Sequence, residues 1–238
     1  MQRRWGKFAR ENGEDGALLV DTGTISEEDW ATSWKAHYHP LRIGQRLVIK
    51  PSWEVWPPAD QPEAACPDDL VIEMDPGMAF GTGTHETTQM CLEALERHLR
   101  SGDAVADIGA GSGILSIAAA LLGSGPVRGW ELDPVAVEVA DRNFRRNGVA
   151  NRCTVEAGEA LEMLGGRYDV ILTNVHTPFL LRLIPRLPEH LRPGGRAILS
   201  GTSETSRPAV LEALQAAGMQ VSAEVRRGEW VAIVALVA

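Results

Sequence analysis

Apolar and polar positions alternate along most of this chain in a pattern that predicts helices and strands in turn. From Glu86 onward, short apolar runs alternate with longer segments whose apolar residues recur at helical spacing. The predicted helices cover residues 86–100, 113–122, 134–147, 178–191 and 207–217. The predicted strands cover residues 104–108, 127–132, 153–157, 168–174, 196–201, 219–226 and 229–237.

The order of these elements predicts an α/β fold. Strands that alternate with helices favour a parallel sheet covered by helices on both faces. The runs VADI (Val105–Ile108) and DVILT (Asp169–Thr173) are almost continuously apolar, as burial on both faces requires. Arg227 and Gly228 join the last two strands, a connection short enough for a hairpin. We therefore expect a seven-stranded Rossmann-like sheet, mostly parallel, with a C-terminal antiparallel hairpin.

The segment before Glu86 has a different pattern and predicts a small N-terminal appendage. Residues 1–25 are polar and contain scattered glycines. Ser26–Asp29 has the S-x-x-D capping pattern of a helix that runs to about Ala36. The other elements expected in this segment are a strand at Leu41–Pro51, a proline-rich irregular linker at Trp53–Asp69 and a strand at Leu70–Met74.

A glycine-rich turn after the first strand of the regular region predicts a cofactor site. Val105–Leu115 reads VADIGAGSGIL, with glycines at Gly109, Gly111 and Gly113. This spacing lacks the third glycine of the dinucleotide fingerprint, where the chain has Ile114, and so argues against NAD. Bare glycines allow close backbone approach to the amino-acid tail and ribose of S-adenosylmethionine, which has no pyrophosphate. A tight strand–helix turn without a ligand is the alternative.

Two acidic residues strengthen the prediction of S-adenosylmethionine. Asp107 ends the strand before the glycines and is expected to meet the cofactor's ammonium group, directly or through water. Glu131 ends the next strand, roughly 20 residues further on, where an acidic side chain can hold the ribose hydroxyls. An ordinary turn would need neither carboxylate.

Further candidates lie at the ends of later strands, because ligands of open α/β sheets bind outside the carboxyl ends of the strands. Gly158 and Glu159 are expected to border the adenine, although a solvated turn is an equal alternative. Asn174 is expected to orient the cofactor tail or the acceptor nitrogen, since its amide has two donors and an acceptor. A turn-forming role is its alternative. His176, two residues later, is a candidate contact to the substrate.

Composition limits the partners and the compartment. The chain has 238 residues, and no apolar run approaches the ~20 residues that span a membrane. Its net charge of −9 argues against sequence-independent nucleic-acid binding and suits a basic protein substrate. Three scattered cysteines predict neither zinc nor a disulfide framework. We expect a cytoplasmic protein without metal, membrane contact or direct contact to nucleic acid.

Four motifs give the chain a family resemblance. GMAFGTGTHETT, DIGAGSGIL, GWELDP and TNV, in this order and spacing, resemble the bacterial ribosomal protein L11 methyltransferase family. The resemblance also takes in Asp29–Glu54 and the closing GEW at Gly228–Trp230, so it covers roughly Glu28 to Ala238. It implies a class I S-adenosylmethionine-dependent enzyme that methylates lysine side chains and the N-terminal amine of one ribosomal protein.

The resemblance also implies site residues and a division of the chain. It assigns cofactor contacts to Thr88, Gly109, Glu131 and Asn174, and it places Phe80, Gly81 and Thr82 against the methionine part of the cofactor. It divides the chain into a reduced N-terminal region with the linker helix, residues 1–54, and a methyltransferase domain, residues 55–238.

One departure from the family leaves the substrate open. Family members carry a larger N-terminal module that grips the ribosomal protein, whereas only about 27 residues precede the linker helix in this chain. The alternatives are a methyltransferase of the same fold that acts on another protein or a small-molecule amine, or a non-catalytic S-adenosylmethionine-binding module. The glycine- and threonine-rich loop GTGTHETT (Gly81–Thr88) argues against the non-catalytic module, because a pure cofactor binder needs no lid on the acceptor side.

Overall fold

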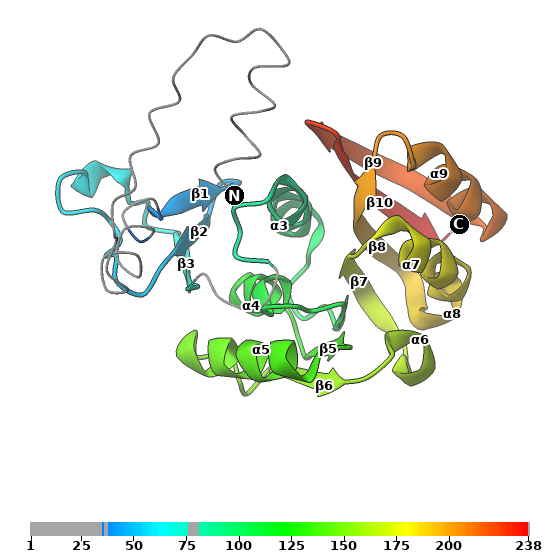
Figure 1. The fold of residues 1–238 in the computed structure, drawn as a ribbon, viewed down its shortest axis with the longest axis horizontal. Helices are drawn as coiled ribbons and strands as arrows, with labels where there is room; N and C mark the ends of the chain where they lie inside the picture. The colour runs from blue at the N-terminus through cyan, green and yellow to red at the C-terminus, as the bar shows by residue number, and fades with distance from the viewer. Residues whose placement is uncertain (1–34, 36–37, 76–80, 238) are drawn as a thin grey trace, which may run out of the picture. The chain divides into compact units, whose positions relative to one another are not determined.

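Figure 1 shows the computed structural model, which describes residues 35, 38–75 and 81–237. The chain divides into two units at Tyr38, and every element below belongs to the larger one, His39–Ala238. The helix expected over residues 26–36, apart from Lys35, lies outside the described residues, as does Phe80. The functional boundary at residue 54 stays a prediction, and the strands at residues 41–50 belong to the larger unit.

The main sheet has the expected seven strands. Their order is β6-β5-β4-β7-β8-β10-β9, with β4 to β8 mutually parallel and β10 antiparallel to both β8 and β9. The bounds are β4 Val105–Ile108, β5 Val127–Glu131, β6 Cys153–Ala157, β7 Tyr168–Asn174, β8 Leu191–Ser203, β9 Met219–Arg227 and β10 Trp230–Val237. The predicted Rossmann-like sheet with its closing hairpin is confirmed.

Helices cover both faces of this sheet, as Figure 1 shows. Alternate residues of β7 enter opposite cores: Val170 and Leu172 pack with α3, α4 and α5, whereas Ile171 packs with α7, α8 and α9. This two-sided burial explains the apolar runs of the central strands. The helices are α3 Glu86–His98, α4 Ile114–Leu121, α5 Pro134–Arg146, α6 Ala160–Met163, α7 Thr177–Leu183, α8 Leu187–His190 and α9 Arg207–Ala216, with 3-10 turns η2 Pro62–Ala64 and η3 Ile184–Arg186.

A second, three-stranded sheet lies before the main one in sequence. It consists of β1 (Leu41–Ile43), β2 (Leu47–Lys50) and β3 (Leu70–Glu73), with β2 antiparallel to β1 and parallel to β3. The single strand predicted over 41–51 is therefore wrong, because Gly44 turns the chain with φ +66°. The strand predicted at 70–74 is confirmed over Leu70–Glu73, and the predicted linker Trp53–Asp69, which connects β2 to β3, is irregular except for η2.

The helix predicted over 178–191 is also corrected. The segment is broken into α7, η3 and α8, and β8 begins at Leu191, five residues before the predicted strand. Pro185 and Pro188 lack the backbone N–H that a continuous helix needs. The short helix α6, capped by the Glu159 side chain, was not predicted. None of the described helices is long and apolar enough to cross a membrane.

Candidate functional site

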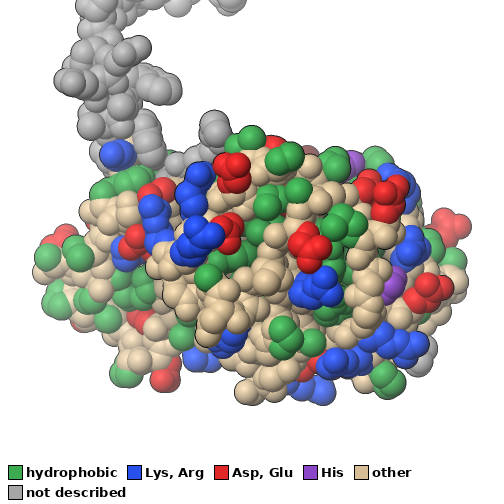
Figure 2. All heavy atoms as spheres, turned by 90° about the horizontal axis from the view of Figure 1, so that it is seen from below, with side chains coloured by type: hydrophobic (Ala, Val, Ile, Leu, Met, Phe, Trp, Pro, Cys, Tyr) green, Lys and Arg blue, Asp and Glu red, His purple; other side chains and the backbone are tan. Residues whose placement is uncertain are grey.

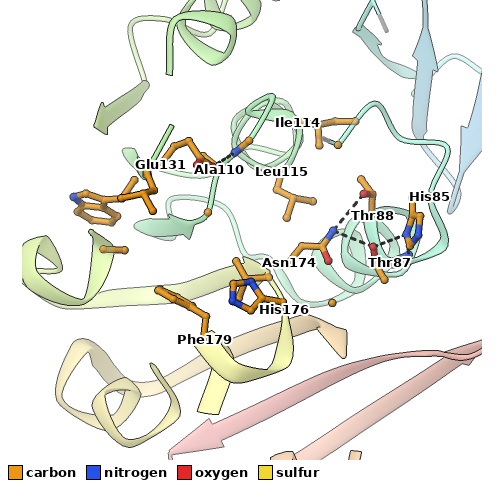
Figure 3. Close-up of a pocket in the computed structure, with 18 of the residues that line it drawn as sticks. His85, Thr87, Thr88, Ala110, Ile114, Leu115, Glu131, Asn174, His176 and Phe179 are labelled. Atoms are coloured by element: carbon orange, nitrogen blue, oxygen red, sulfur yellow. Dashed lines mark hydrogen bonds between the residues drawn. The ribbon is translucent and has the colours of Figure 1, made fainter. Parts of the chain in front are cut away.

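A cavity of about 520 Å³ lies at the carboxyl ends of β4, β5 and β7, and Figure 3 shows it from close by. Its volume falls in the range of small-molecule sites. Of the residues predicted from the sequence, the ones that line it are Gly81, Thr88, Gly109, Gly111, Glu131, Gly158, Glu159, Asn174 and His176. Thr82, Asp107 and Gly113 are described but do not line it.

The glycines of the turn after β4 serve two different purposes. Gly109 and Gly111 line the cavity, and both have positive φ. A Cβ on Gly109 would lie 2.5 Å from Val175 Cγ1, so a side chain there would collide with the cavity wall. A Cβ on Gly113 would lie 2.5 Å from Phe144 Cε1 of α5, away from the cavity lining. Packing on Phe144 therefore explains Gly113 without a ligand.

Glu131 is fixed by the turn that it faces. One carboxylate oxygen, Oε2, accepts the backbone N–H of Gly111 at 2.9 Å, and Oε1 accepts that of Asp133 at 3.1 Å. Each carboxylate oxygen has a second lone pair, so Glu131 can still accept hydrogen bonds from a ligand. A carboxylate held in this way suits a diol such as the ribose of a nucleoside.

Asp107 lies behind the glycine turn and is completely buried. Ser116 Oγ donates to its Oδ2 at 2.6 Å, whereas its Oδ1 has no hydrogen-bond partner among the described residues. Burial, with a smaller contribution from the charge of Glu131, raises the pKa of this carboxyl to about 6. An unpartnered buried carboxylate oxygen next to the turn fits a cationic group nearby, such as the ammonium of S-adenosylmethionine, but contact through the cavity is not seen.

The loop before α3 is tied to the glycine turn. Ser112 Oγ, in that turn, donates to the Gly81 carbonyl at 2.6 Å, which brings Gly81 to the cavity. Thr82 instead forms a long contact with Thr84, 3.4 Å between their Oγ1 atoms. The loop GTGTHETT (Gly81–Thr88) and the glycine-rich turn after β4 therefore meet at one wall of the cavity.

The start of α3 and the end of β7 are joined by hydrogen bonds at the cavity wall. The Asn174 amide nitrogen donates to Thr87 Oγ1 at 3.2 Å and to Thr88 Oγ1 at 3.3 Å, as Figure 3 shows. Thr87 Oγ1 is also 2.8 Å from His85 Nδ1. Both threonines are buried, and their two hydroxyls hold the Asn174 amide in one orientation.

Apolar and aromatic side chains form the remaining wall. Phe179 of α7 lies with its ring centroid 6.3 Å from that of His176, and Trp230 of β10 lies edge-on to His85 at 5.2 Å. The lining also includes Gly158, Glu159 and Leu132, and Leu132 is 69% exposed. We call the part of the cavity beside Glu131 its polar end, and the part lined by His176, Phe179 and Trp230 its aromatic end.

Sequence reasoning missed several of these cavity residues. Thr87 was not singled out, although it stands inside the quoted motif GTGTHETT. Trp230, Phe179 and Gly201 also line the cavity, and the sequence pattern gives none of them a role in the site. They come from β10, α7 and β8, and only the order of the sheet brings these elements beside β7. The closing GEW of the resemblance was the one available signal for Trp230.

Comparison with known proteins decides the family. A profile of ribosomal protein L11 methyltransferase (PrmA) matches residues 3–237. The chain belongs to this family. It is 47% identical to the ribosomal protein L11 methyltransferase of Pelotomaculum thermopropionicum over 92% of this chain and 69% of that protein. Identity to the ribosomal protein L11 methyltransferase of Geobacillus kaustophilus is also 47%, over 93% of this chain and 69% of the relative.

Solved structures agree with this membership. The ribosomal protein L11 methylase of Lactobacillus delbrueckii subsp. bulgaricus superposes with a TM-score of 0.76 at 33% identity, over 83% of this chain and 98% of that chain. An RNA methyltransferase from Salinibacter ruber, in complex with S-adenosyl-L-homocysteine, shares the fold at 20% identity and a TM-score of 0.51, over 61% of this chain and 89% of that chain. The protein is a class I S-adenosylmethionine-dependent methyltransferase.

Proposed function

We propose that this enzyme methylates lysine side-chain amines, the N-terminal amine, or both, of ribosomal protein L11. Membership of the family carries this proposal, since relatives 47% identical over more than nine-tenths of the chain are named for that substrate. The net charge of −9 suits a basic protein partner. We place the reaction in the cytoplasm, without nucleic acid or membrane as a direct partner. Residues 55–238 act as the methyltransferase domain and residues 1–54 as an N-terminal region.

The polar end of the cavity suits the nucleoside half of the cofactor. Glu131 accepts hydrogen bonds from the ribose hydroxyls, and Gly158 with Glu159 borders the adenine. Gly109, Gly111 and Thr88 border the methionine half, together with Gly81 of the loop before α3. Asp107 contributes its charge to the ammonium group, and Gly113 contributes the shape of the turn. The fixed carboxylate of Glu131 and the bare backbone at Gly109 support this placement.

The aromatic end of the cavity suits the amine acceptor. S-adenosylmethionine supplies a methyl group already activated by its sulfonium, so the enzyme has to present a neutral amine in line with the carbon–sulfur bond. A lysine amine of pKa ~10.4 is mostly protonated at pH 7, a deficit of about 4–5 kcal/mol. Phe179 and Trp230 disfavour the charged form by excluding water, because burial in apolar surroundings lowers the pKa of an ammonium group.

Asn174 and His176 contact the acceptor in this proposal. An amide oxygen of Asn174 accepts an N–H of the amine and so aims its lone pair at the methyl group. His176 lines the same end of the cavity and borders the acceptor there. Orientation of this kind can be worth roughly 7–11 kcal/mol of the barrier, so no strong base is needed in the site.

Intact-mass spectrometry tests the proposal. L11 from the same source is incubated with the enzyme and S-adenosylmethionine, and the expected result is a series of mass steps of one methyl group each. An equally basic ribosomal protein serves as the control and should remain unmodified. If L11 keeps its mass while the same sample binds S-adenosylhomocysteine, the acceptor is another protein or a small-molecule amine, and this proposal is wrong.

A further inference from the structure

Three side chains form a hydrogen-bonded chain from the N-terminus of α3 to the cavity. His85 caps the helix, Thr87 lies in its first turn, and Asn174 ends β7. Thr87 Oγ1 bridges the other two, 2.8 Å from His85 Nδ1 and 3.2 Å from Asn174 Nδ2. A bridge through one hydroxyl has a direction, because a hydroxyl has a single hydrogen to donate.

The backbone determines that direction. The N–H of Thr87 donates to His85 Nδ1 at 3.3 Å, so this ring nitrogen accepts and its proton is on Nε2. The Thr87 hydroxyl, 2.8 Å from the same nitrogen, must then donate to it as well. Having donated its only hydrogen, the hydroxyl can only accept from Asn174. The group of Asn174 that faces Thr87 is therefore the NH₂ and not the carbonyl oxygen.

We propose that His85 is a positioning residue, which acts through Thr87 to keep the Asn174 amide oxygen available to the cavity. Among the described residues, the structure records no hydrogen-bond partner for that oxygen. Thr88 supports the same orientation, since its hydroxyl accepts the other Asn174 hydrogen at 3.3 Å. The aromatic end of the cavity then presents an oxygen, which selects substrates that carry an N–H.

The contact between His85 and Trp230 gives this arrangement a link to the aromatic wall. The Trp230 ring lies edge-on to the His85 ring, with 5.2 Å between centroids, and both line the cavity. A substrate side chain that packs on Trp230 therefore touches the residue that orients Asn174. This inference rests on the proposed amine acceptor, but the orientation of Asn174 itself can be measured without any acceptor.

Thr87 offers the most selective variants. Thr87→Val removes the hydroxyl and keeps the shape, and we expect it to lower kcat about tenfold, the loss that one missing hydrogen bond gives. The dissociation constant of S-adenosylhomocysteine should change less than threefold, since the ribose and adenine contacts remain. Thr87→Ser keeps the hydroxyl and should bring kcat back to within about threefold of the wild type.

Thr173→Val is the matched control. Thr173 precedes Asn174 in β7, is completely buried, and its hydroxyl has no partner among the described residues. The same isosteric change there should leave kcat unaltered. The proposal is overturned if Thr87→Val retains full turnover, if Thr87→Ser loses as much as Thr87→Val, or if weaker cofactor binding accounts for the whole effect.

Nitrogen NMR of the histidine rings tests the direction of the hydrogen bonds from Asn174 through Thr87 to His85 in the free enzyme. The protein has six histidines, and His85→Asn identifies the His85 signals while leaving an oxygen that can cap α3. We expect an unprotonated Nδ1 and a protonated Nε2 at His85. A proton on Nδ1 would make His85 the donor to Thr87 and would refute the inference. This readout stands whether or not L11 is the substrate.

Discussion

At the scale of single residues, the site depends on carboxylates and amides whose orientation is set by hydrogen bonds to the backbone or to hydroxyls. Glu131 is held by two backbone N–H groups, and Asn174 by two threonine hydroxyls. Asp107 differs, because its single recorded donor is Ser116 and its other oxygen has no partner among the described residues. A buried carboxylate in this state should make stability depend on pH.

Replacing Asp107 by Asn tests this dependence. The folded-state pKa of about 6 lies above the ordinary value of 3.8 for an aspartate. Between these two pH values the folded protein therefore keeps a proton that the unfolded chain has released. The stability that this proton provides is complete below about pH 4 and is lost as the pH rises through about 6. Asp107→Asn removes the cost of the buried charge, so its melting temperature relative to wild type should rise by a few degrees between pH 4.5 and pH 8.

Thermal unfolding of both proteins without cofactor measures the difference. The comparison is between two pH values for the same pair of proteins, so any fixed cost of the new amide cancels. A difference in melting temperature that stays constant from pH 4.5 to pH 8 would contradict the raised pKa of Asp107. The opposite slope would show that Asp107 is stabilised in its charged form.

Sequence pattern found the residues whose chemistry is tied to a strand end. Glu131 and Asn174 end apolar strands, Gly109 follows one directly, and all three line the cavity. The pattern could not separate Gly111, which lines the cavity, from Gly113, which makes room for Phe144. It also could not find Phe179 or Trp230, because their positions depend on which strands are neighbours.

At the scale of elements, the small sheet is fastened to α3 by one carboxylate. Glu96 of α3 accepts the backbone N–H groups of Gln45 and Arg46, each at 2.7 Å, at the turn between β1 and β2. Gly44 begins this turn with φ +66°, and a Cβ there would collide with the Glu96 carboxylate. Because α3 also carries Thr87 and Thr88, this contact connects the small sheet to the helix at the site.

Gly44→Ala should therefore lower the free energy of unfolding more than backbone strain alone would. An alanine at positive φ costs about 1–2 kcal/mol, and displacing Glu96 adds the loss of its two hydrogen bonds. Gly102→Ala is the control, with φ +83° and open space around the new Cβ. Urea unfolding of both variants measures the two costs. Equal losses would show that the Glu96 contact contributes nothing to stability.

The elements that sequence reasoning placed wrongly have local causes. The turn at Gly44 divides one expected strand into two, and a glycine inside an apolar run was the available sign. Pro185 likewise stands inside the segment predicted as one helix. The main strands and their order of appearance were predicted because each is a compact apolar run, and burial on both faces leaves little freedom in their composition.

At the scale of the whole molecule, the parallel strands bring their carboxyl ends to one edge of the sheet. The cavity lies at that edge, and the hairpin of β9 and β10 adds Trp230 to its acceptor end. Membership of the L11 methyltransferase family and this geometry support one account. In it, the polar end of the cavity holds the nucleoside, the aromatic end holds the amine, and the two ends meet near Asn174. The account depends most on the cofactor lying against Glu131.

Calorimetric titration with S-adenosylhomocysteine tests that placement directly. Glu131→Ala should weaken binding at least about tenfold, since hydrogen bonds to a carboxylate are worth about 1.5–3 kcal/mol. Glu131→Gln keeps an oxygen for the Gly111 N–H, so the turn should stay intact in this variant. It should nevertheless bind the cofactor product more weakly, because the carboxylate is lost. Glu156→Ala removes an equal charge from the end of β6, where Glu156 pairs with Arg128 outside the cavity lining, and should bind like wild type. Unchanged affinity in both Glu131 variants would contradict the account, because the cofactor would then have to bind elsewhere.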